Sequence, residues 1–225
     1  MTSGIEIHPR KNLAAPHIKA LAGLPTSVVS DVVGRLLGTT GLRPVNRSAV
    51  TVCGNAVTVK VRAGDNLLIH KALQILEPGD VLVVDGEGDI SRALVGEIMM
   101  TVAKTNGAVG FVIDGAVRDV EAFEEHQFPC WARGVNLRGP YKDGPGTINT
   151  AITVGGMLVN PGDIILGDSD GVVAITPSLA QEIAVLAKNK VQQEHEMIQS
   201  ILNRSYNDSW VDETLKIKGV KNASN

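Results

Sequence analysis

Two apolar segments separated by the length of one helix constrain the fold of this chain more than any other feature. VLVVD (81–85) and AVGFVID (108–114) lack the alternation of a half-exposed strand, and such runs are typical of strands buried on both faces. The apolar spacing of residues 96–106 predicts a helix between them. Strand, helix and strand in this order predict a βαβ unit with two parallel strands. Such units bind ligands where their strands end, here at the GEGD loop and the DGAVRD turn.

Further helices and strands are predicted on both sides of this unit. Helical spacing predicts three more helices, over 26–38 with Thr26 or Ser27 as the cap, over 66–76 and over 177–203. Alternation over 50–62 predicts one long strand, or a pair broken at Cys53 and Gly54. The segments FPCWARG, INTAITVGGMLV, DIILGD and GVVAIT predict more strands. The fold class is therefore α/β, with a sheet-rich core, flanking helices and a long C-terminal helix.

The length of 225 residues and the hydrophobic fraction of 44% favour one domain over two small ones. Its core is expected over about residues 25–205. Residues 1–12 are polar and aperiodic and predict an arm or a disordered start, whereas residues 206–225 predict a tail that either frays or packs on a neighbour. Because aromatic residues are 3% of the chain, the core is expected to consist of Val, Ile, Leu and Ala.

Charge and hydropathy argue against two classes of partner. The net charge is −3, and no Lys/Arg cluster is interleaved with aromatic residues, so we expect no nucleic-acid partner. No apolar stretch approaches the roughly 20 residues that span a bilayer, and the chain start lacks the apolar region of a signal peptide. We therefore expect no membrane partner and a cytoplasmic location. Cys53 and Cys130 lack CxxC spacing and are expected to be small buried residues.

Several common catalytic motifs are absent from the sequence. The loop after VLVVD contains neither GxGxxG nor GxxxxGK[ST], which argues against a nucleotide site. The five histidines show no HxH or HExxH spacing, so a zinc site built on histidine is not expected. No GxSxG elbow occurs, and covalent catalysis therefore has little support.

Arg118 and Asp119 are the main candidates for chemistry, because they directly follow a predicted buried strand. A guanidinium can hold a planar carboxylate through two parallel hydrogen bonds, and a carboxylate oxygen suits Mg²⁺ or Mn²⁺. The alternatives are a surface ion pair worth less than about 1 kcal/mol, or a helix cap.

The start of the helix over 96–106 is the second candidate. Its first residues are Gly96, Glu97, Ile98 and Met99. Free N–H groups in the first turn of a helix attract carboxylates, and a glycine lets a ligand approach the backbone closely. The alternative is a glycine kept for packing.

Five segments together resemble a known family. They are GDNLLIHKAL, EPGDVLVVDGEGDISRALVGE, NGAVGFVIDGAVRD, ARGVNLRGPYKDGPG and VNPGDIILGDSDGVVAI. In order and spacing they resemble the 4-hydroxy-4-methyl-2-oxoglutarate aldolases and the regulator of ribonuclease activity A, over about residues 25–200. The resemblance implies a swivelling β/β/α domain that assembles as a homotrimer or a hexamer, with sites between subunits.

For the aldolase branch, the resemblance implies a metal-dependent class II pyruvate aldolase. Its substrates are 2-oxo acids, 4-hydroxy-4-methyl-2-oxoglutarate or 4-carboxy-4-hydroxy-2-oxoadipate, and many members also decarboxylate oxaloacetate. The cofactor is a divalent cation, Mg²⁺ or Mn²⁺. Both reactions leave pyruvate enolate, whose charge a cation and an arginine can stabilise.

The resemblance also assigns roles to residues. Backbone amides of the turn Gly96, Glu97, Ile98 and Met99 correspond to those that bind the substrate, Arg118 corresponds to the substrate arginine, and Asp119 corresponds to the one direct metal ligand. Glu97 falls where the family has an acid that contacts metal-bound water. A glutamate on the neighbouring subunit's closing helix has a similar role, and Glu194 matches it better than Glu196.

Two other classes of function stay open. The regulator branch binds ribonuclease E without catalysis, and fold alone does not assign activity. A catalytically silent oligomer is the third class. The presence of Gly96, Glu97, Arg118, Asp119 and a glutamate on the C-terminal helix favours the enzyme.

Overall fold

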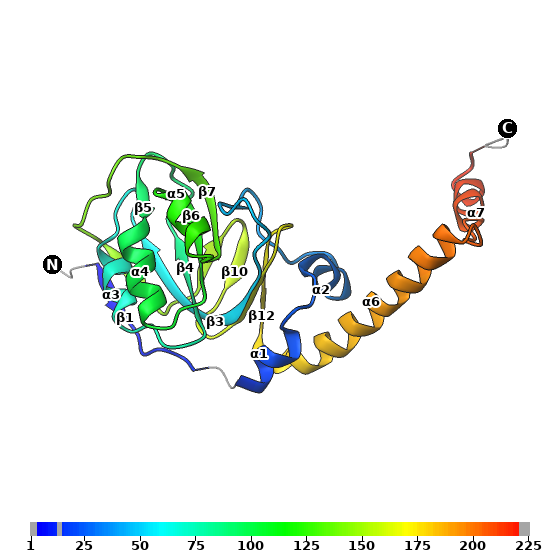
Figure 1. Cartoon of the computed structure of the whole chain (residues 1–225), viewed down its shortest axis with the longest axis horizontal. Helices are drawn as coiled ribbons and strands as arrows, with labels where there is room; N and C mark the ends of the chain where they lie inside the picture. Colours follow the sequence, from blue (N-terminus) through cyan, green and yellow to red (C-terminus); the bar gives the residue numbers. More distant parts are fainter. Residues whose placement is uncertain (1–3, 13–14, 221–225) are drawn as a thin grey trace. The chain divides into compact units, whose positions relative to one another are not determined.

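Parallel strands form the centre of the fold, with helices packed around them (Figure 1). The computed structural model describes residues 4–12 and 15–220. The strands are β1 (Ile5–Ile7), β2 (Arg43–Pro44), β3 (Val52–Val61), β4 (Asp80–Asp85), β5 (Ala93–Val95), β6 (Gly110–Val117), β7 (Cys130–Val135), β8 (Gly146–Ile148), β9 (Ile152–Val154), β10 (Met157–Val159), β11 (Ile164–Gly167) and β12 (Val172–Ile175). The helices are α1 (Ala15–Leu21), α2 (Thr26–Val32), α3 (Leu67–Leu73), α4 (Glu97–Thr105), α5 (Val120–Glu125), the 3-10 helix η1 (Pro177–Leu179), α6 (Ala180–Leu202) and α7 (Trp210–Ile217).

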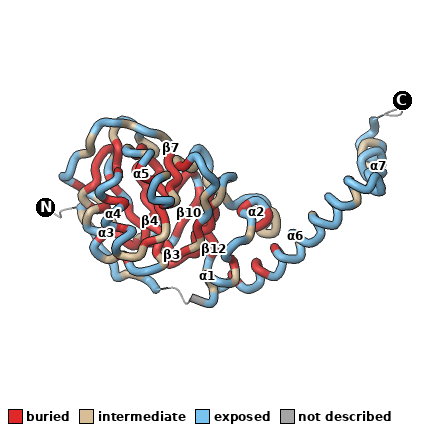
Figure 2. Tube along the Cα trace, in the orientation of Figure 1, coloured by how far each residue is buried: buried red, intermediate tan, exposed pale blue. Residues whose placement is uncertain are grey.

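The central strands lie in the order β3-β4-β6-β7, and all three neighbouring pairs are parallel. Every residue of β4 and β6 is buried, as their continuous apolar sequence predicts (Figure 2). One face of the sheet packs against α3, α4 and α5, and the hairpin β9–β10 covers the other. A third core lies between α1, α2, the strands β11 and β12, and the first turns of α6.

The predicted βαβ unit is confirmed, because β4, α4 and β6 follow one another and the two strands pair in parallel. The segment over 50–62 forms one strand, β3, and is not broken at Cys53. Gly54 explains why no break is needed. A Cβ at Gly54 would lie 2.5 Å from the carbonyl oxygen of Gly79, so its missing side chain allows two backbones to pass closely within a regular strand.

The first predicted helix is shorter than expected and has another cap. It ends at Val32, because Gly34 and Arg35 adopt positive φ angles of 87° and 62°. Neither Thr26 nor Ser27 caps it. Instead the carboxylate of Asp168 accepts hydrogen bonds from the Thr26 backbone N (2.8 Å) and the Thr26 hydroxyl (2.6 Å). A cap supplied by a residue so distant in the chain leaves no local signal.

Within the predicted arm or disordered start, residues 4–12 include a short strand, and the prediction of an arm stays a prediction. Ile5–Ile7 form β1, which pairs in parallel with β8 at the edge of the sheet. Arg10 then donates two hydrogen bonds to the fully buried carboxylate of Asp80, at 2.8 and 2.6 Å. An edge strand offers free backbone groups that any extended segment can pair with, so the three residues Ile5–Ile7 form a strand without a longer alternating pattern. Residues 1–3 lie outside the described part.

Contacts divide the chain into two units, Met1–Ala187 and Lys188–Asn225. The prediction of a single domain stays a prediction. The expected closing helix is present as η1 and α6, and the expected tail contains α7 as far as the chain is described, whereas residues 221–225 lie outside. None of the described helices has the length and apolar character needed to cross a bilayer.

Candidate active site

The short strand β5 brings the two predicted halves of the site together. It pairs in parallel with the end of β6, with Ala93 opposite Ala116 and Val95 opposite Val117. Parallel neighbours end at the same edge of a sheet, so Gly96 after β5 and Arg118 after β6 become neighbours. The backbone N of Arg118 donates a hydrogen bond to the carbonyl oxygen of Val95 at 3.0 Å. The sequence predicted the two halves but not β5, because three apolar residues are too few for a periodicity argument.

Asp119 has a left-handed backbone conformation, with φ 56° and ψ 43°. It precedes α5, yet its side chain makes no capping hydrogen bond to that helix. Its Oδ2 instead accepts a hydrogen bond from the backbone N of Glu97, the first residue of α4, at 3.1 Å. Aspartate tolerates the left-handed region better than most residues. A helix cap is one of the two alternatives to a functional role, and Asp119 does cap a helix, but this helix is α4 and not α5, which it precedes.

Gly96 lies against both candidate side chains. A Cβ at this position would collide with Oδ2 of Asp119 and would lie 2.9 Å from Cγ of Arg118. Its backbone is extended, with φ −156°, so the requirement for glycine arises from space and not from strain. The glycine is needed for packing, and what packs there is the Arg118–Asp119 pair.

Arg118 and Asp119 are both accessible to solvent. Their side chains are 42% and 43% exposed, and Nε of Arg118 lies 3.6 Å from Oδ2 of Asp119. An exposed pair at this distance stabilises a protein by less than about 1 kcal/mol. Stability therefore does not explain why the two charges lie together at this edge of the sheet.

The loop after β7 faces the guanidinium of Arg118. A Cβ at Gly139 would lie 3.6 Å from Nη1 of Arg118. Arg92 holds this loop by donating hydrogen bonds to the carbonyl oxygen of Gly139 and the hydroxyl of Tyr141, both at 2.8 Å. Its guanidinium also stacks 4.2 Å from the centre of the Tyr141 ring. Sequence reasoning missed Arg92 and Tyr141, because no motif links positions so far apart in the chain.

Asn66 is a third residue whose role at this edge sequence reasoning missed. It is buried, and its Nδ2 donates to the carbonyl oxygen of Leu94 at 2.9 Å and contacts Sδ of Met99 at 3.4 Å. Asn66 thereby joins the start of α3 to β5 and to the first turn of α4. One turn further along α3, burial and the nearby Lys142 lower the pKa of His70, which disfavours its charged form.

The other predicted site residues differ in exposure. Glu97 and Ile98 are exposed on the first turn of α4, whereas Met99 is buried. Glu97 N is engaged by Asp119, and Met100 N bonds back to the carbonyl oxygen of Gly96 at 3.0 Å. Glu194 belongs to the second unit, where Lys190 lies 3.5 Å from its Oε1. Its predicted role, like that of Glu196, stays a prediction.

The side chains at this edge fit a cation that retains much of its water. Within the described ranges, no three His, Cys, Asp or Glu side chains are grouped so that they could hold a metal ion. The side-chain hydrogen bond of Asp119 engages Oδ2, which leaves Oδ1 of this half-exposed carboxylate to bind a cation. Mg²⁺ keeps several waters and needs as few as one or two carboxylates, whereas a zinc site needs three or four protein ligands. The donors present therefore suit Mg²⁺ or Mn²⁺.

Comparison with known proteins decides the family. The family model described as RraA-like, Aldolase/RraA, matches residues 26–174. This chain belongs to the RraA-like family. A relative from Halalkalibacterium halodurans, with the provisional name 4-hydroxy-4-methyl-2-oxoglutarate aldolase, is 41% identical over 168 residues, which are 74% of this chain and 80% of the relative.

Solved structures agree with the RraA-like fold. An uncharacterised protein from Pseudomonas syringae has a TM-score of 0.75 at 24% identity, over 86% of this chain and 95% of that one, and shows the fold alone. An RNA-processing inhibitor, RraA, from a Thermus species has a TM-score of 0.61 at 29% identity, over 67% of this chain and 92% of that one. The predicted family and the α/β fold class are confirmed.

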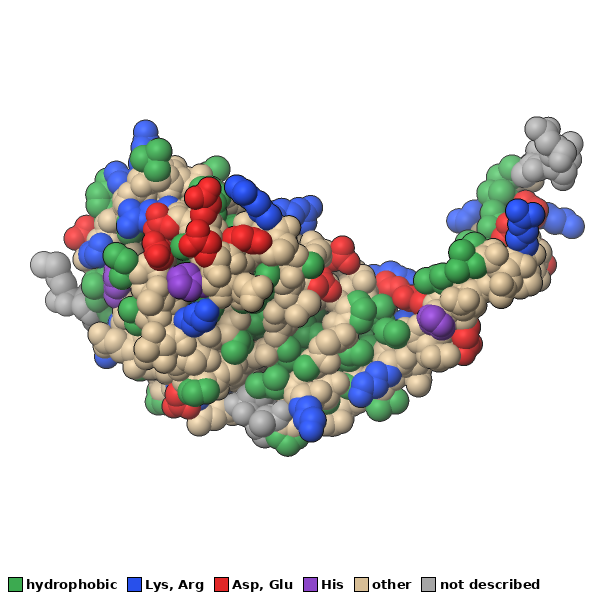
Figure 3. Space-filling view, viewed as in Figure 1, with side chains coloured by type: hydrophobic (Ala, Val, Ile, Leu, Met, Phe, Trp, Pro, Cys, Tyr) green, Lys and Arg blue, Asp and Glu red, His purple; other side chains and the backbone are tan. Residues whose placement is uncertain are grey.

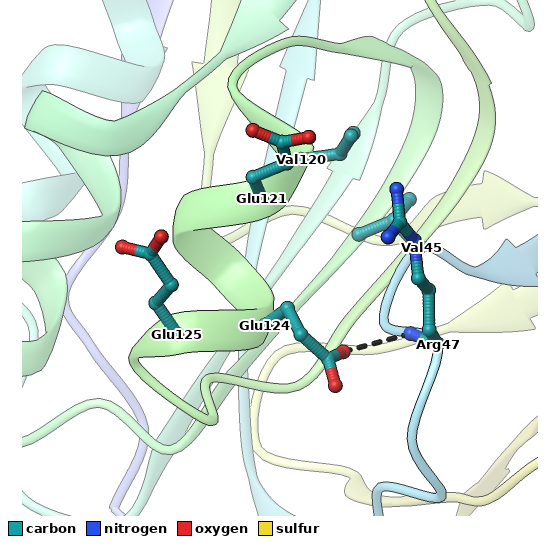
Figure 4. A pocket seen from close by; sticks show the side chains of 6 residues that line it. All are labelled: Val45, Arg47, Val120, Glu121, Glu124 and Glu125. Carbon is teal, nitrogen blue, oxygen red and sulfur yellow. Dashed lines mark hydrogen bonds between the residues drawn. The ribbon is translucent and has the colours of Figure 1, made fainter.

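A hollow of about 220 Å³ in this RraA-like chain lies beside α5, and its lining includes Val120, the residue that follows Asp119 (Figure 4). It is lined by Val45, Arg47, Val120, Glu121, Glu124 and Glu125. Acidic side chains gather over this helix (Figure 3). Glu124 has a structural role. Its carboxylate accepts hydrogen bonds from the Ser48 hydroxyl and from the backbone N of Arg47, the latter at 2.8 Å, and these bonds lower the pKa of Glu124. Arg118 and Asp119 are not in its lining, so the hollow is separate from the candidate site.

Proposed function

We propose that this chain is a divalent-metal-dependent lyase that forms pyruvate from a 2-oxo diacid. The substrates we propose are 4-hydroxy-4-methyl-2-oxoglutarate or 4-carboxy-4-hydroxy-2-oxoadipate, with oxaloacetate decarboxylation as a second reaction. The observation that carries the proposal is the accessible Arg118–Asp119 pair packed against the open first turn of α4. The aldolase name of the relative from Halalkalibacterium halodurans supports it.

Each proposed residue has a distinct task. Arg118 binds and neutralises a substrate carboxylate, since its guanidinium is half-exposed and its Nη1 lies beside Gly139. The backbone N–H groups of Ile98 and Met99 lie at the positive end of α4 and donate to the same substrate. Oδ1 of Asp119 holds the cation. When bound, a divalent cation supplies Lewis-acid polarisation of the substrate's keto group.

The proposed reactions share one product. In aldol cleavage the C4 hydroxyl loses its proton, the C3–C4 bond breaks, and its electron pair moves to the keto group, leaving pyruvate enolate and a second 2-oxo acid. In oxaloacetate decarboxylation the C3–C4 bond breaks with release of CO₂ and leaves the same enolate. Protonation at C3 completes either reaction. Glu97, exposed on the first turn of α4, and Glu194 of a neighbouring copy position the water that exchanges these protons.

The test measures pyruvate after the purified protein is mixed with oxaloacetate or 4-hydroxy-4-methyl-2-oxoglutarate, with and without Mg²⁺. We expect Mg²⁺-dependent pyruvate formation with at least one substrate. If neither substrate gives pyruvate above the rate with Mg²⁺ alone, the enzyme proposal is wrong.

Two substitutions test the proposed roles of Asp119 and Arg118. Asp119→Ala is expected to abolish metal-dependent turnover, because it removes the one direct ligand. Arg118→Ala is expected to lower kcat/KM roughly a hundredfold, about 2.7 kcal/mol of transition-state stabilisation. Arg35→Ala is a control for the loss of an exposed arginine away from the site, because Arg35, beyond the end of α2, pairs with Asp31 of α2 at 3.2 Å. Undiminished metal-dependent activity of Asp119→Ala would show that the cation is held elsewhere.

A non-catalytic regulator that binds ribonuclease E is the second candidate. It is favoured by the similarity to the Thermus protein named as an RNA-processing inhibitor. The discriminating experiment measures RNA cleavage by ribonuclease E with increasing amounts of this chain. Inhibition at near-equal amounts, together with no pyruvate formation, would favour the regulator.

A further inference from the structure

The carboxylate of Asp119 makes contacts that a metal ligand does not need. Its Oδ2 accepts the Glu97 backbone N–H at 3.1 Å and faces Nε of Arg118 at 3.6 Å, whereas Oδ1 has neither contact. The two oxygens are therefore in different environments.

The first turn of α4 lacks any cap of its own. Its N-cap residue is Gly96, which has no side chain, and the N–H of Glu97 therefore needs an acceptor from elsewhere. Asp119 reaches this N–H because its left-handed backbone, with φ 56°, turns the side chain away from α5. The contact also requires Gly96, since a Cβ there would occupy the position of Oδ2.

We propose that Asp119 divides its carboxylate between two tasks, with Oδ2 capping α4 and Oδ1 alone binding the cation, and that Gly96 is the positioning residue that permits this arrangement. The role of Oδ1 as a metal ligand rests on the proposed function, whereas the role of Oδ2 as a cap does not. Because Glu97 N is already bonded to Oδ2, the amides within the first turn of α4 that are left for a substrate carboxylate are those of Ile98 and Met99.

Asparagine at position 119 separates the two tasks. Its amide oxygen can cap a helix as well as aspartate does, and it tolerates the left-handed region, but it is a much poorer ligand for a hard cation. In metal-free protein with EDTA, Asp119→Ala is expected to lower Tm by roughly 2–4 °C more than Asp119→Asn does. Both variants are expected to lose at least roughly tenfold in affinity for Mn²⁺, measured by titration calorimetry.

Two matched controls isolate the cap from other effects. Gln127→Ala places alanine at another exposed left-handed position, with φ 49°, and measures the cost of that conformation alone. Gly134→Ala adds a methyl group that meets Ile90 at an ordinary 3.4 Å, and serves as the control for Gly96→Ala. We expect Gly96→Ala, unlike Gly134→Ala, to weaken Mn²⁺ binding roughly tenfold or more while Asp119 is still present.

The outcomes separate this proposal from the proposed function. Equal Tm values for metal-free Asp119→Asn and Asp119→Ala, after subtraction of the Gln127→Ala effect, would overturn the cap. Normal Mn²⁺ affinity in Gly96→Ala would overturn its positioning role. Absence of Mn²⁺ binding by the wild-type chain would contradict the proposed lyase, but the Tm comparison in EDTA would still decide the cap.

Discussion

Asp119 and Asp65 both accept backbone N–H groups from distant segments, but they differ in exposure. Asp119 is open to solvent, whereas Asp65 is fully buried. Asp65 accepts from the backbone N of Leu67, Asp143 and Gly144, at 2.9, 2.7 and 3.1 Å. These bonds join the loop after β3 to the loop that faces Arg118. A carboxylate with three such donors is structural, whereas one that has an oxygen left over is available for chemistry.

Asp65 should make stability depend on acid pH. Burial alone would raise its pKa, but the three backbone donors and the charge of Arg62 hold it below the ordinary 3.8. A depressed pKa stabilises the fold at pH values above the unfolded pKa and ceases to do so as pH falls through the folded value. Asp65→Asn should therefore lower the free energy of unfolding by roughly 1.5–3 kcal/mol at pH 7.

The measurement is urea unfolding of wild type and Asp65→Asn between pH 7 and pH 3. The difference between the two proteins should shrink below about pH 4, where Asp65 of the unfolded chain becomes protonated. A constant difference over this range would show that the Asp65 charge does not contribute.

Among the elements, the hairpin β9–β10 is held at its turn by one side chain of the sheet that it covers. Oδ2 of Asp114, on β6, accepts the backbone N of Gly155 at the hairpin turn at 2.6 Å. The other oxygen, Oδ1, accepts Nε of Arg133 on β7 at 2.5 Å. Asp114 is buried, so removal of its carboxylate leaves two donors without a partner in a poorly hydrated place.

Asp114→Ala should loosen this hairpin more than the rest of the sheet. Loss of a charged acceptor predicts roughly ten- to a hundredfold faster amide exchange in Ile152–Val154 and Met157–Val159. Hydrogen–deuterium exchange with mass spectrometry measures this directly. Asp31→Ala breaks the pair between Asp31 of α2 and Arg35 and should leave the hairpin unchanged. Equal exchange in the two variants would contradict the anchoring role.

At the scale of the whole molecule, the unit Lys188–Asn225 has no core of its own. None of its residues within the described part is buried. Its large apolar side chains are exposed, among them Met197, Ile198, Ile201, Leu202, Trp210 and Ile217. Exposed apolar side chains grouped on one element are typical of an interaction surface, and we expect assembly of this chain with further copies, as the family resemblance implies, to cover them.

Charged substitutions on α6 test this assembly. Ile198→Lys combined with Ile201→Lys should shift the molar mass toward that of one chain, 23.7 kDa, because lysine does not stay in an apolar contact. Light scattering after size exclusion measures the mass. Gln199→Lys, on the same helix, is the control and should leave the mass unchanged. An unchanged mass of the double variant would exclude this face from the interface.

The sequence alone determined the parts of this protein that local patterns encode. Continuous apolar runs identified β4 and β6, and helical spacing identified α4 and α6. The order strand, helix, strand predicted that β4 and β6 pair in parallel. Arg118 and Asp119 could be selected because they follow a buried strand, and the family resemblance was visible in five segments. These features depend on neighbours in the chain.

Only the tertiary structure decided the features that join distant segments. Strand β5 is too short to recognise, yet it places Gly96 beside Arg118. The caps of α2 and α4 come from Asp168 and Asp119, because a helix end accepts any carboxylate that the fold brings within reach. Sequence marked Asp119 as a residue for chemistry or for a cap. The structure shows that Oδ2 caps a neighbouring helix, whereas Oδ1 of the half-exposed side chain does not take part in this contact, a division that depends on where two strands end.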